Sequence, residues 1–453
     1  MDISLPATPA CEAARGIVRR LRGEGYEAFF VGGCVRDLVR GVVPEEFDIV
    51  TAARPDRIVF LFPHTVPVGA QFGVVLVVEG GRRFEVATYR TDEAYLDGRR
   101  PSGVAFATLE EDVRRRDFTM NGLVLDPETG RVIDLVGGLA DIGCRLIRTI
   151  GDPLRRFGED RLRMLRAARF AANLGFSVEE RTLEAMRECA PAIGEVSAER
   201  IREEMTKLLS RGGARRGMEL LWHTGLLGEI LPEAEKMIGV DQPPAFHPEG
   251  DVWEHTLRML ALLGEGGAAD PRLAWGVLFH DLGKALTRSE DEKGIHFYGH
   301  VQKGEELAGE ILERLRFSRA DRETVLALIR HHMRFMSVER MRPNRLKRFL
   351  RMDDFPLHLE LHRLDCLASH GDLSSYDFCV RKLAEIPEEV LRPPRLVTGD
   401  DLVAAGYSPG PLFGRILRAV EDAQLNGEIA THDEAMRWVG ERWGEASRKD
   451  GGC

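Results

Sequence analysis

The sequence predicts an α+β protein in which a small N-terminal α/β head precedes a long all-α body. Up to about residue 150, short runs rich in β-branched residues alternate with glycine-rich turns, after one helical pattern at residues 10–24. Beyond that point the apolar residues recur at helical spacing, as in EDRLRMLRAARFAANL, and strand patterns largely vanish. A chain of 453 residues is also too long for one compact core, and its length suggests about three domains.

Two joints rich in proline and glycine divide the helical body. They are GVDQPPAFHPEGD at residues 239–251 and RPPRLVTGDD at residues 392–401. Such segments interrupt helices and are typical of connections between domains. We therefore expect a head at residues 1–150, a helical neck at 151–240, a second helical domain at 241–395 and a C-terminal helical tail at 396–453.

Composition and charge narrow the class of protein. The content of 43% hydrophobic and 30% charged residues is ordinary for a globular chain, and no apolar run approaches the roughly 18 residues of a membrane span. The N-terminal MDISLPATPA lacks the features of a signal peptide, so we expect a cytoplasmic protein without a membrane partner. The seven cysteines form no CxxC pair and predict neither a disulfide framework nor a thiolate zinc site. The formal net charge of −10 argues against broad, non-specific binding to nucleic acid but not against local basic surfaces.

The first candidate site begins where an apolar strand runs into two glycines. The run AFFV at residues 28–31 is followed by Gly32 and Gly33, and then by a predicted helix that carries Arg36 and Asp37 in its first turn. Glycines that leave a strand let backbone N–H groups approach a phosphate, and a helix N-terminus favours an anion. We therefore predict that Arg36 holds a phosphate group at this turn.

Three carboxylates are predicted to meet in the sheet beside this turn. The stretch PEEFDIVT at residues 44–51 predicts a strand with Glu46 and Asp48 on one face, and a hairpin predicted within residues 74–90 supplies Glu85. Such acids repel one another unless cations neutralise them, and oxygen ligands suit Mg²⁺. Two Mg²⁺ ions about 3.5 to 4 Å apart can assist an in-line displacement at phosphorus. Taken alone, the paired acids of this stretch are more typical of an exposed, solvated strand face.

A second pair of side chains, in the predicted neck, fits the recognition of a nucleobase. In FGEDRLRMLRAARF, Asp160 and Arg163 are three residues apart and are predicted to share a helix face. Cytosine and adenine present an amino donor beside a ring-nitrogen acceptor, whereas uracil and guanine present a carbonyl beside an N–H. An acid that accepts from the amino group and an arginine that donates to the ring nitrogen would select cytosine and adenine. A surface ion pair is the alternative explanation of this spacing.

Over nearly its whole length the sequence resembles the class II tRNA nucleotidyltransferase and bacterial poly(A) polymerase family. The motifs that carry the resemblance are VGGCVRD, FDIVTAARP, FEVATYRTDEAYLDGRRP, RRRDFTMNG, IDLVGG and RFGEDRLRMLRAARFAANLGF, in the family's order and spacing. The resemblance implies that Asp48 binds metal, that Glu85 is the third acid, and that DEAYLDGRRP is a loop that rearranges when specificity switches between C and A. The residues for which it implies a role in nucleotide binding are Arg36, Asp37, Arg116, Asp117, Asn121, Glu159, Asp160, Arg163 and Arg166.

One position departs from the family pattern. Where the family has Asp-x-Asp, this chain has Glu46-Phe47-Asp48. Glutamate keeps the charge but adds a methylene, and a misplacement of about 1 Å can cost ~100-fold in rate. We expect an active head, with the effect of Glu46 on turnover left open. The run Arg114–Arg116 is expected to help Arg36 hold a triphosphate.

The segment after residue 245 contains a second candidate site. His280 and Asp281 are adjacent, with His255 upstream and Asp365 downstream. Imidazole and carboxylate ligands together suit a divalent transition metal. These four residues resemble the ligand signature of the HD phosphohydrolase superfamily, and nucleotidyltransferases with such a domain can show phosphatase or 2′,3′-cyclic phosphodiesterase activity. Further candidates for a second ion, at positions where binuclear members have extra ligands, are His300, His331 and His332.

Taken with the resemblance, these features predict a template-independent RNA nucleotidyltransferase that adds CCA, or its terminal A, to tRNA 3′ ends. In the predicted reaction the 3′ hydroxyl of tRNA attacks the α-phosphorus of CTP or ATP, pyrophosphate leaves, and Mg²⁺ assists at the head. The neck would bind the base and the RNA, and DNA is not expected as a partner. Within the family, a poly(A) polymerase or an enzyme restricted to A or CC addition stays open. From another class, an HD-type phosphohydrolase with a degraded RNA-binding head stays open as well.

Overall fold

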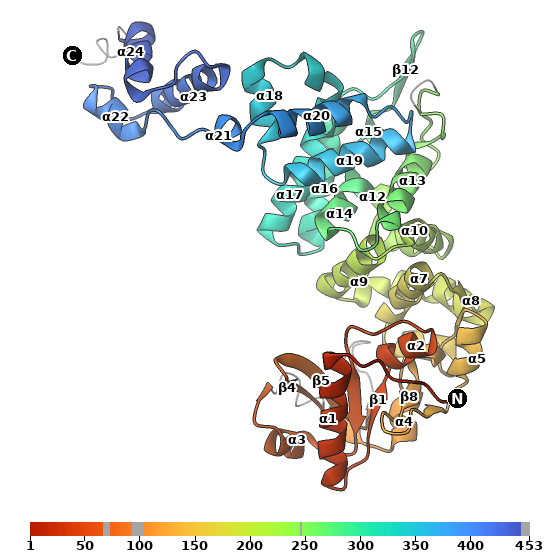
Figure 1. The fold of residues 1–453 in the computed structure, drawn as a ribbon. Helices are drawn as coiled ribbons and strands as arrows, with labels where there is room; N and C mark the ends of the chain where they lie inside the picture. The colour runs from red at the N-terminus through yellow and green to blue at the C-terminus, as the bar shows by residue number, and fades with distance from the viewer. Residues whose placement is uncertain (67–72, 93–103, 245–246, 445–453) are drawn as a thin grey trace.

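The computed structural model describes residues 1–66, 73–92, 104–244 and 247–444. Figure 1 shows an elongated molecule with the head at one end, successive helices rising from it, and the C-terminal helices extending sideways at the other end. The N-terminus lies at the head, and the C-terminus lies at the far tip. The mixed head and the helical body predicted from the sequence are confirmed.

The head is built on a seven-stranded mixed sheet with strand order β3-β4-β5-β2-β1-β8-β9. Strands β2 and β5 run parallel, and the other neighbours run antiparallel. The strands are β1 (Ala28–Val31), β2 (Asp48–Thr51), β3 (Thr65–Val66), β4 (Val74–Glu79), β5 (Arg82–Thr88), β8 (Leu123–Leu125) and β9 (Val132–Asp134). Two-stranded pairs are formed by β6 (Arg90–Asp92) with β7 (Val104–Phe106), β10 (Leu146–Ile147) with β11 (Ser177–Val178), and β12 (Ser289–Asp291) with β13 (Gly294–His296).

Helix α1 covers the head sheet because its apolar residues recur at helical spacing. Ala14, Ile17, Val18 and Leu21 are fully buried, while Arg19 and Arg20 of the same helix are exposed. Thr8 caps its N-terminus by accepting a hydrogen bond from the backbone N–H of Cys11 (3.2 Å). The helices of the head are α1 (Pro9–Gly23), α2 (Gly33–Val39), α3 (Pro55–Leu61), α4 (Leu109–Arg114), the 3-10 helix η2 (Thr119–Asn121) and α5 (Gly138–Gly143).

The body and tail are almost wholly helical. Helices that follow the head are α6 (Pro153–Glu159), α7 (Leu162–Leu174), α8 (Glu180–Cys189), η3 (Ala190–Glu195), α9 (Ala198–Ser210), α10 (Ala214–His223), α11 (Leu226–Ile230) and α12 (Pro232–Glu235). The next group comprises α13 (Val252–Glu265), α14 (Pro271–Phe279), α15 (Lys284–Thr287), α16 (His300–Arg314), α17 (Arg319–His331), η4 (His332–Arg340), α18 (Pro343–Leu350), α19 (Phe355–Ala368), α20 (Ser374–Glu385) and α21 (Glu388–Leu391). The C-terminal helices are α22 (Gly399–Ala404), α23 (Pro411–Asn426) and α24 (His432–Trp443).

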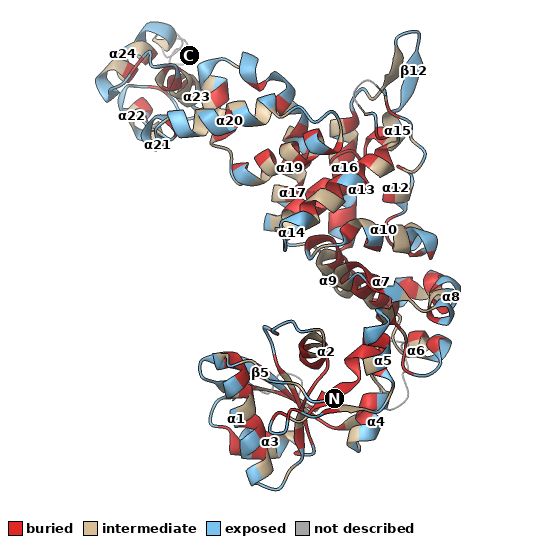
Figure 2. Cartoon of the chain, turned by 45° about the vertical axis from the view of Figure 1, so that its right-hand side comes forward, coloured by how far each residue is buried: buried red, intermediate tan, exposed pale blue. Residues whose placement is uncertain are grey.

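The main apolar core is continuous from the head into the body. One cluster of buried side chains extends from Ala10 to Ala368, and Figure 2 shows the inward faces of the body helices as buried. The helices at the C-terminal tip instead pack around a separate cluster that extends from Val397 to Val439. Packing therefore couples the head to the helices next to it more extensively than to the tip.

Two local expectations differ from the structure. Glu46 does not lie on a strand, because β1 ends at Val31, the partner of Asp48, and leaves no neighbour for residues before Asp48. Asp160 and Arg163 do not share a continuous helix, because Asp160 is extended (φ −148°, ψ 104°) between α6 and α7. Of the predicted loop DEAYLDGRRP, residues 93–101 lie outside the described part of the chain.

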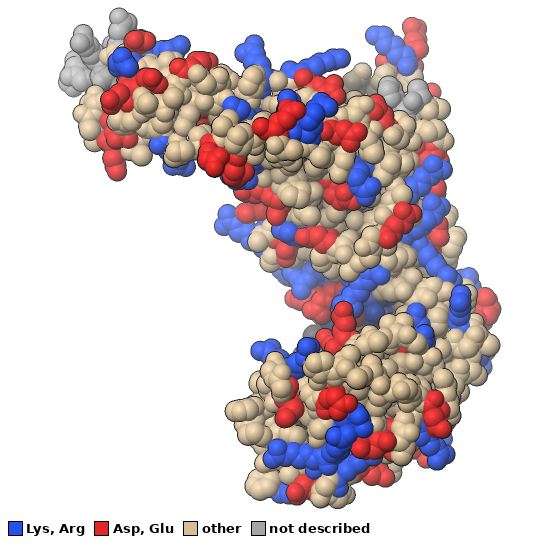
Figure 3. Space-filling view, viewed as in Figure 1, with Lys and Arg blue, Asp and Glu red and all other residues tan. Residues whose placement is uncertain are grey.

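The surface carries both signs of charge. In Figure 3, basic and acidic side chains are interspersed over the visible face, which is hollowed between the head and the helical body. Among the described residues, no helix combines the length and the apolar character that a membrane crossing requires.

Candidate functional site

A cavity of about 680 Å³ lies where the head meets the neck. Its walls come from the turn after β1, the start of β2, residues 115–121, and helices α7 and α9. Three predicted residues do not line the cavity but interact with residues that do. Asp37 and Glu159 form ion pairs with Arg36 and Arg163, respectively. Glu85 repels Asp48. The predicted residues that line the cavity are Gly32, Gly33, Arg36, Glu46, Asp48, Arg116, Asp117, Asn121, Asp160, Arg163 and Arg166.

At the edge of this cavity, the carboxylate of Asp48 is repelled by those of Glu46 and Glu85. Asp48 and Glu85 are neighbours on the parallel strands β2 and β5, each one residue before the paired Ile49 and Val86. Burial, together with repulsion from Glu85 and Glu46, outweighs the attraction of Arg116 and raises the pKa of Asp48 to about 6. A divalent cation among these oxygens would offset the repulsion, and an all-oxygen ligand set suits Mg²⁺. The donor set therefore fits the metal that the sequence predicted.

Gly32 keeps the space between a cationic and an anionic side chain open. Its φ of +77° belongs to a region that favours glycine. A Cβ at this position would lie 3.5 Å from Nη1 of Arg116 and 3.8 Å from Oδ2 of Asp48. A side chain there would strain the backbone and fill the approach to the acids.

Asp37 and Asp112 orient arginines of the cavity. The Arg36 guanidinium donates to both oxygens of Asp37 (3.0 and 2.9 Å) and to Oδ1 of Asn121 (3.0 Å). Asp112 on α4, whose side chain is fully buried, holds Arg115 at 2.7 Å and Arg116 at 3.0 Å. Because these guanidinium groups are held by carboxylates, they are pre-oriented for an anionic ligand.

Asp117 links the head to α7. Its Oδ2 accepts from Arg166 (2.6 Å), and its Oδ1 accepts from Asn121 Nδ2 (3.0 Å) and the N–H of Phe118 (2.7 Å). Burial alone would raise the pKa of Asp117, but Arg166 and the hydrogen bond from Asn121 lower it to about 2. Both carboxylate oxygens are thus engaged by the protein, so Asp117 positions Arg166 and Asn121 at the cavity wall.

Asp160 and Arg163, the residues predicted to read the base, are fixed by neighbouring groups although Asp160 lies between α6 and α7. Nη1 of Arg163 pairs with Glu159 (2.9 Å), and its guanidinium also donates to the carbonyl of Arg115 (3.0 Å). Both oxygens of Asp160 accept from Arg200 on α9 (3.2 and 2.8 Å). Asp160 and Arg163 therefore reach one cavity with fixed orientations, as a donor and acceptor pair for a base requires.

Sequence reasoning missed the cationic wall that α9 contributes. Arg200, Lys207 and Arg211 recur at intervals of seven and four residues, so they share one helical face, and all three line the cavity. This periodicity was the signal that would have found them. On the same face, buried Glu204 pairs with Arg169 of α7, which also lines the cavity.

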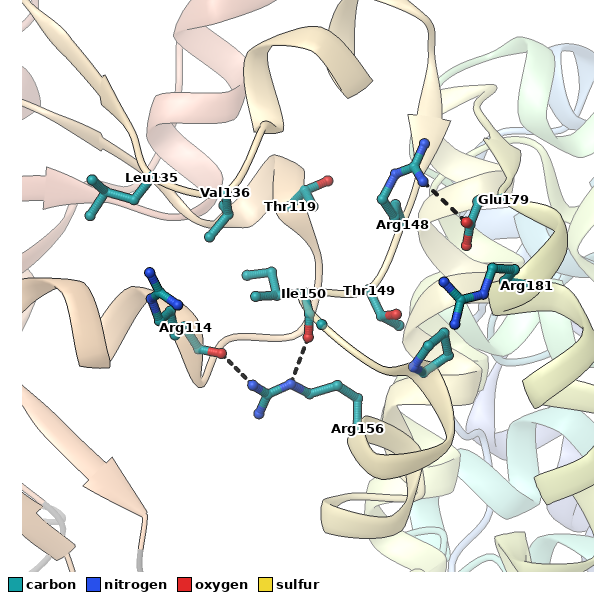
Figure 4. Close-up of a pocket in the computed structure, with 12 residues that line it drawn as sticks. Arg114, Thr119, Leu135, Val136, Arg148, Thr149, Ile150, Arg156, Glu179 and Arg181 are labelled. Carbon is teal, nitrogen blue, oxygen red and sulfur yellow. Dashed lines mark hydrogen bonds and ion pairs between the residues drawn. The ribbon is translucent and has the colours of Figure 1, made fainter.

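Arg114 lies apart from the cavity that Arg115 and Arg116 line. Figure 4 shows its side chain beside a separate cavity of about 390 Å³, together with Arg148, Arg156 and Arg181. Arg156 donates to the carbonyls of Ile150 and Arg114 and so forms part of the boundary of this second cavity. The expectation that the whole run of three arginines faces the same ligand is therefore not met.

The second candidate site is a buried cluster of histidines and acids. Nε2 of His255 lies 3.1 Å from Oδ1 of Asp365, and Nε2 of His280 lies 3.2 Å from Oδ2 of Asp281. His332 and His300 approach Oδ1 of Asp281 at 3.7 and 3.8 Å. Two groups of ligand atoms share Asp281, one with His255 and His280 and the other with His300 and His332, and a third group joins His255 to His247 and Glu249. Among the described residues, Asp365 belongs to none of these groups and lies beside His255.

Comparisons with known proteins match the segments of the chain in which the two candidate sites lie. The sequence matches three family models, the "Poly A polymerase head domain" over residues 28–148, the "Probable RNA and SrmB- binding site of polymerase A" over 175–238, and the "HD domain" over 252–360. A CCA-adding enzyme of Geobacillus stearothermophilus is 34% identical over 96% of this chain and 98% of its own length. The chain belongs to the family of CCA-adding enzymes.

Other relatives and solved structures support this membership in the CCA-adding enzymes. A CCA-adding enzyme of Geobacillus thermodenitrificans is 48% identical, over 50% of this chain and 56% of that protein. The crystal structure of the Bacillus stearothermophilus CCA-adding enzyme in complex with CTP matches with a TM-score of 0.76 and 29% identity, over 98% of this chain and 100% of that one. The Thermotoga maritima CCA-adding enzyme complexed with tRNA_CCA, at 19% identity and a TM-score of 0.53, shares the fold over 94% of this chain and 93% of its own.

Membership in the CCA-adding enzymes indicates use of a divalent metal. Separately, the histidine cluster of this chain has the chemistry of a metal site. Nε2 of His255 and Nε2 of His280 are buried and have no partner in hydrogen-bonding geometry among the described residues. These two nitrogens lie 3.1 Å from Oδ1 of Asp365 and 3.2 Å from Oδ2 of Asp281, respectively. The orphaned nitrogens and adjacent carboxylates therefore fit a divalent transition metal.

His331 lies outside this cluster. Its ring lies 5.8 Å from that of His358, and it belongs to none of the three groups of ligand atoms found in the described residues. Successive residues of a helix point about 100° apart, so His332 faces Asp281 while His331 faces elsewhere. His247 and Glu249, which the sequence analysis did not single out, instead lie against His255.

A cavity of about 900 Å³ opens beside the cluster. Asp281, His300, His332 and Asp365 form part of its lining, and Phe297 and Met336 are among its apolar residues. Lys284 is buried within hydrogen-bond distance of Asp281 (2.7 Å) and also lines the cavity.

Proposed function

We propose that this chain adds the nucleotides CCA to the 3′ ends of tRNA, using CTP and ATP. The observation that carries the proposal is the position of Asp48, partly buried between two other acids at the edge of a cavity walled by arginines. Full-length similarity to a CCA-adding enzyme supports it. The cytoplasm, where tRNA matures, is the location that this substrate implies.

The carboxylates and arginines of the cavity divide the work on the nucleotide. Glu46 and Asp48, with Glu85 behind them, would hold Mg²⁺, which when bound neutralises charge at the reacting phosphate and activates the attacking hydroxyl. Arg36 and Arg116 would hold the triphosphate, because each is oriented by a carboxylate and lines the same cavity as the acids.

Asp160 and Arg163 would select the base. The Asp160 carboxylate, fixed by Arg200, would accept a hydrogen bond from the amino group of cytosine or adenine. The Arg163 guanidinium, fixed by Glu159, would donate to the adjacent ring nitrogen. We further propose that the head occupies residues 1–150, the neck 151–240 and the tail 396–453.

The proposal predicts a defined pattern of incorporation with three RNAs. We expect CMP to be added to a tRNA that lacks CCA, AMP to be added to a tRNA that ends in CC, and neither to be added to an unrelated RNA oligomer. The measurement is incorporation of labelled CTP or ATP in the presence of Mg²⁺. Repeated AMP addition to the unrelated oligomer would instead indicate a poly(A) polymerase, and use of only one of the two nucleotides would indicate a restricted enzyme.

A single substitution tests the departure at Glu46. We expect Glu46→Asp to retain the rate of CMP addition or to raise it by up to about 100-fold, because the shorter acid restores the spacing of the family motif. Single-turnover incorporation measures this rate, with Glu45→Asp at the neighbouring exposed position as a matched control. A clear loss of rate in Glu46→Asp alone would mean that the site is built around the longer side chain.

A second candidate function rests on the histidine cluster. We propose that residues 241–395 bind a divalent transition metal through His255, His280, Asp281 and Asp365, and hydrolyse phosphate esters. The ion would supply an activated water when bound. His300 and His332 would help to hold a second ion, since both face Asp281. The adjoining cavity of about 900 Å³ supports this proposal, because it offers room for an organic ester beside the cluster.

A further inference from the structure

The rings of the four histidines that face Asp281 or Asp365 are oriented in two different ways. These histidines are His255, His280, His300 and His332. Nδ1 of His280, His300 and His332 each lies 2.7 to 2.9 Å from the backbone carbonyl three residues earlier. A carbonyl oxygen only accepts, so in each ring Nδ1 carries the proton and Nε2 is left with a lone pair. Nε2 is also the atom that each ring turns toward Asp281.

His255 is the exception, because its Nδ1 contacts a side chain. Oε1 of Glu249 lies 2.6 Å from Nδ1 of His255 and 2.9 Å from Nδ1 of His247. The Glu249 side chain is completely buried, and its other oxygen makes no hydrogen bond within the described part of the chain. A buried carboxylate costs free energy unless it is paired, so its place beside His255 calls for an explanation.

An ionised carboxylate can only accept a hydrogen bond, so a Glu249 in this state keeps the proton of His255 on Nδ1. In the neutral ring Nε2 of His255 then carries the lone pair, 3.1 Å from Oδ1 of Asp365, and the ring lies 5.4 Å from that of His280. Carboxylates that hold the outer nitrogen of a metal-bound histidine fix its orientation and raise its basicity. The backbone carbonyls behind the other three rings carry no full charge to do the same.

We propose that Glu249 is a positioning residue for the metal centre, orienting His255 through Nδ1 and strengthening it as a ligand, with His247 holding Glu249 in place. This inference rests on the proposed metal site, and it adds residues from the Pro/Gly-rich joint at 239–251 to that site. His247 also lines the cavity of about 900 Å³, so the chain of contacts runs from the cavity through Glu249 to His255.

The test is a titration of the full chain with Co²⁺, whose visible absorption reports its ligands. Millimolar Mg²⁺ is kept present so that it occupies the site in the head, whose candidate ligands are all oxygen atoms. Mg²⁺ does not favour imidazole ligands, so the histidine cluster stays available to Co²⁺. We expect Glu249→Gln to weaken Co²⁺ binding 10- to 100-fold without changing the spectrum at saturation, and His247→Ala to weaken it less. Glu254→Gln is the matched control, because Glu254 adjoins His255 in sequence but pairs with Arg215 and Arg258 at the surface.

The outcomes separate this inference from the proposed metal site. If the unaltered chain and Asp365→Ala bind Co²⁺ equally weakly, the metal site itself is wrong and the inference fails with it. If the unaltered chain binds and Glu249→Gln binds as tightly, only the positioning role is wrong. A changed spectrum at saturation would make Glu249 a ligand instead. Glu249→Asp keeps the charge and is expected to recover part of the affinity, while unchanged nucleotide addition shows that each variant is folded.

Discussion

Asp48→Ala is expected to lower the rate of nucleotide addition by about 10³-fold or more. Asp48 begins β2 beside Glu85 and is the acid whose pKa is raised by burial and by the charges of Glu85 and Glu46. A metal ion contributes several kcal/mol to stabilising the charge of the transition state, and each 1.36 kcal/mol is a factor of ten in rate. Loss of the ligand at the centre of the three acids should remove most of that contribution.

The measurement for Asp48→Ala is single-turnover CMP addition to a tRNA that lacks CCA, at saturating Mg²⁺. Glu45→Ala is the matched control, since Glu45 is an exposed acid of the same segment and does not line the cavity. Binding of tRNA by Asp48→Ala should remain close to that of the unaltered chain, because the substitution leaves the arginines in place. A variant that adds CMP at the normal rate would rule out Asp48 as a metal ligand.

The fold class followed from local patterns. The β-branched residues and the glycine turn of the runs that become β4 and β5, and the helical periodicity of the run that becomes α7, depend on neighbours in the sequence, so they were readable without the structure. The family of the chain was likewise recognised from motifs, and the full-length similarity confirms it. The glycine turn at Gly32 was predicted for the same reason, because few residues other than glycine adopt its φ.

The details that were not predicted depend on contacts between distant segments. Whether Glu46 lies on a strand is decided by where β1 ends, which the residues around Glu46 do not reveal. The extended conformation of Asp160 accompanies its ion pair with Arg200, which lies forty residues further along the chain. Glu249 stands in an irregular joint without periodicity, so nothing in its neighbourhood pointed to His255.

The residues that line the cavity in the head were therefore easier to predict from the sequence than the residues that orient them. Most of the predicted residues line the cavity, whereas Asp112 and Glu204, which orient its arginines, were not singled out from the sequence. Their roles become visible only when burial is known, because an acid on a helix is more often a solvated surface residue. Burial turns each of them into a carboxylate that requires a cationic partner.

Asp160→Ala is expected to lower the preference for CTP over UTP by about 10- to 100-fold. A hydrogen bond to a charged group contributes roughly 1.5 to 3 kcal/mol, and the alanine would remove the acceptor for the amino group of cytosine. Uracil offers a carbonyl there, so its weak incorporation should change little. The measurement is kcat/KM for CTP and UTP on a tRNA that lacks CCA. Asp152→Ala, at an exposed aspartate before α6, is the matched control.

A selective loss distinguishes base reading from a structural role for Asp160. Both oxygens of Asp160 pair with Arg200, so removing the carboxylate also frees a cation at the cavity wall. If that ion pair only braces the junction of α6 and α7, kcat/KM should fall by the same factor for CTP and UTP, and the preference should stay constant. If Asp160 reads the amino group, kcat/KM for CTP should fall while that for UTP holds. Arg163 still donates toward the ring nitrogen in this variant, so part of the preference against uracil, whose N3 carries a hydrogen, should survive.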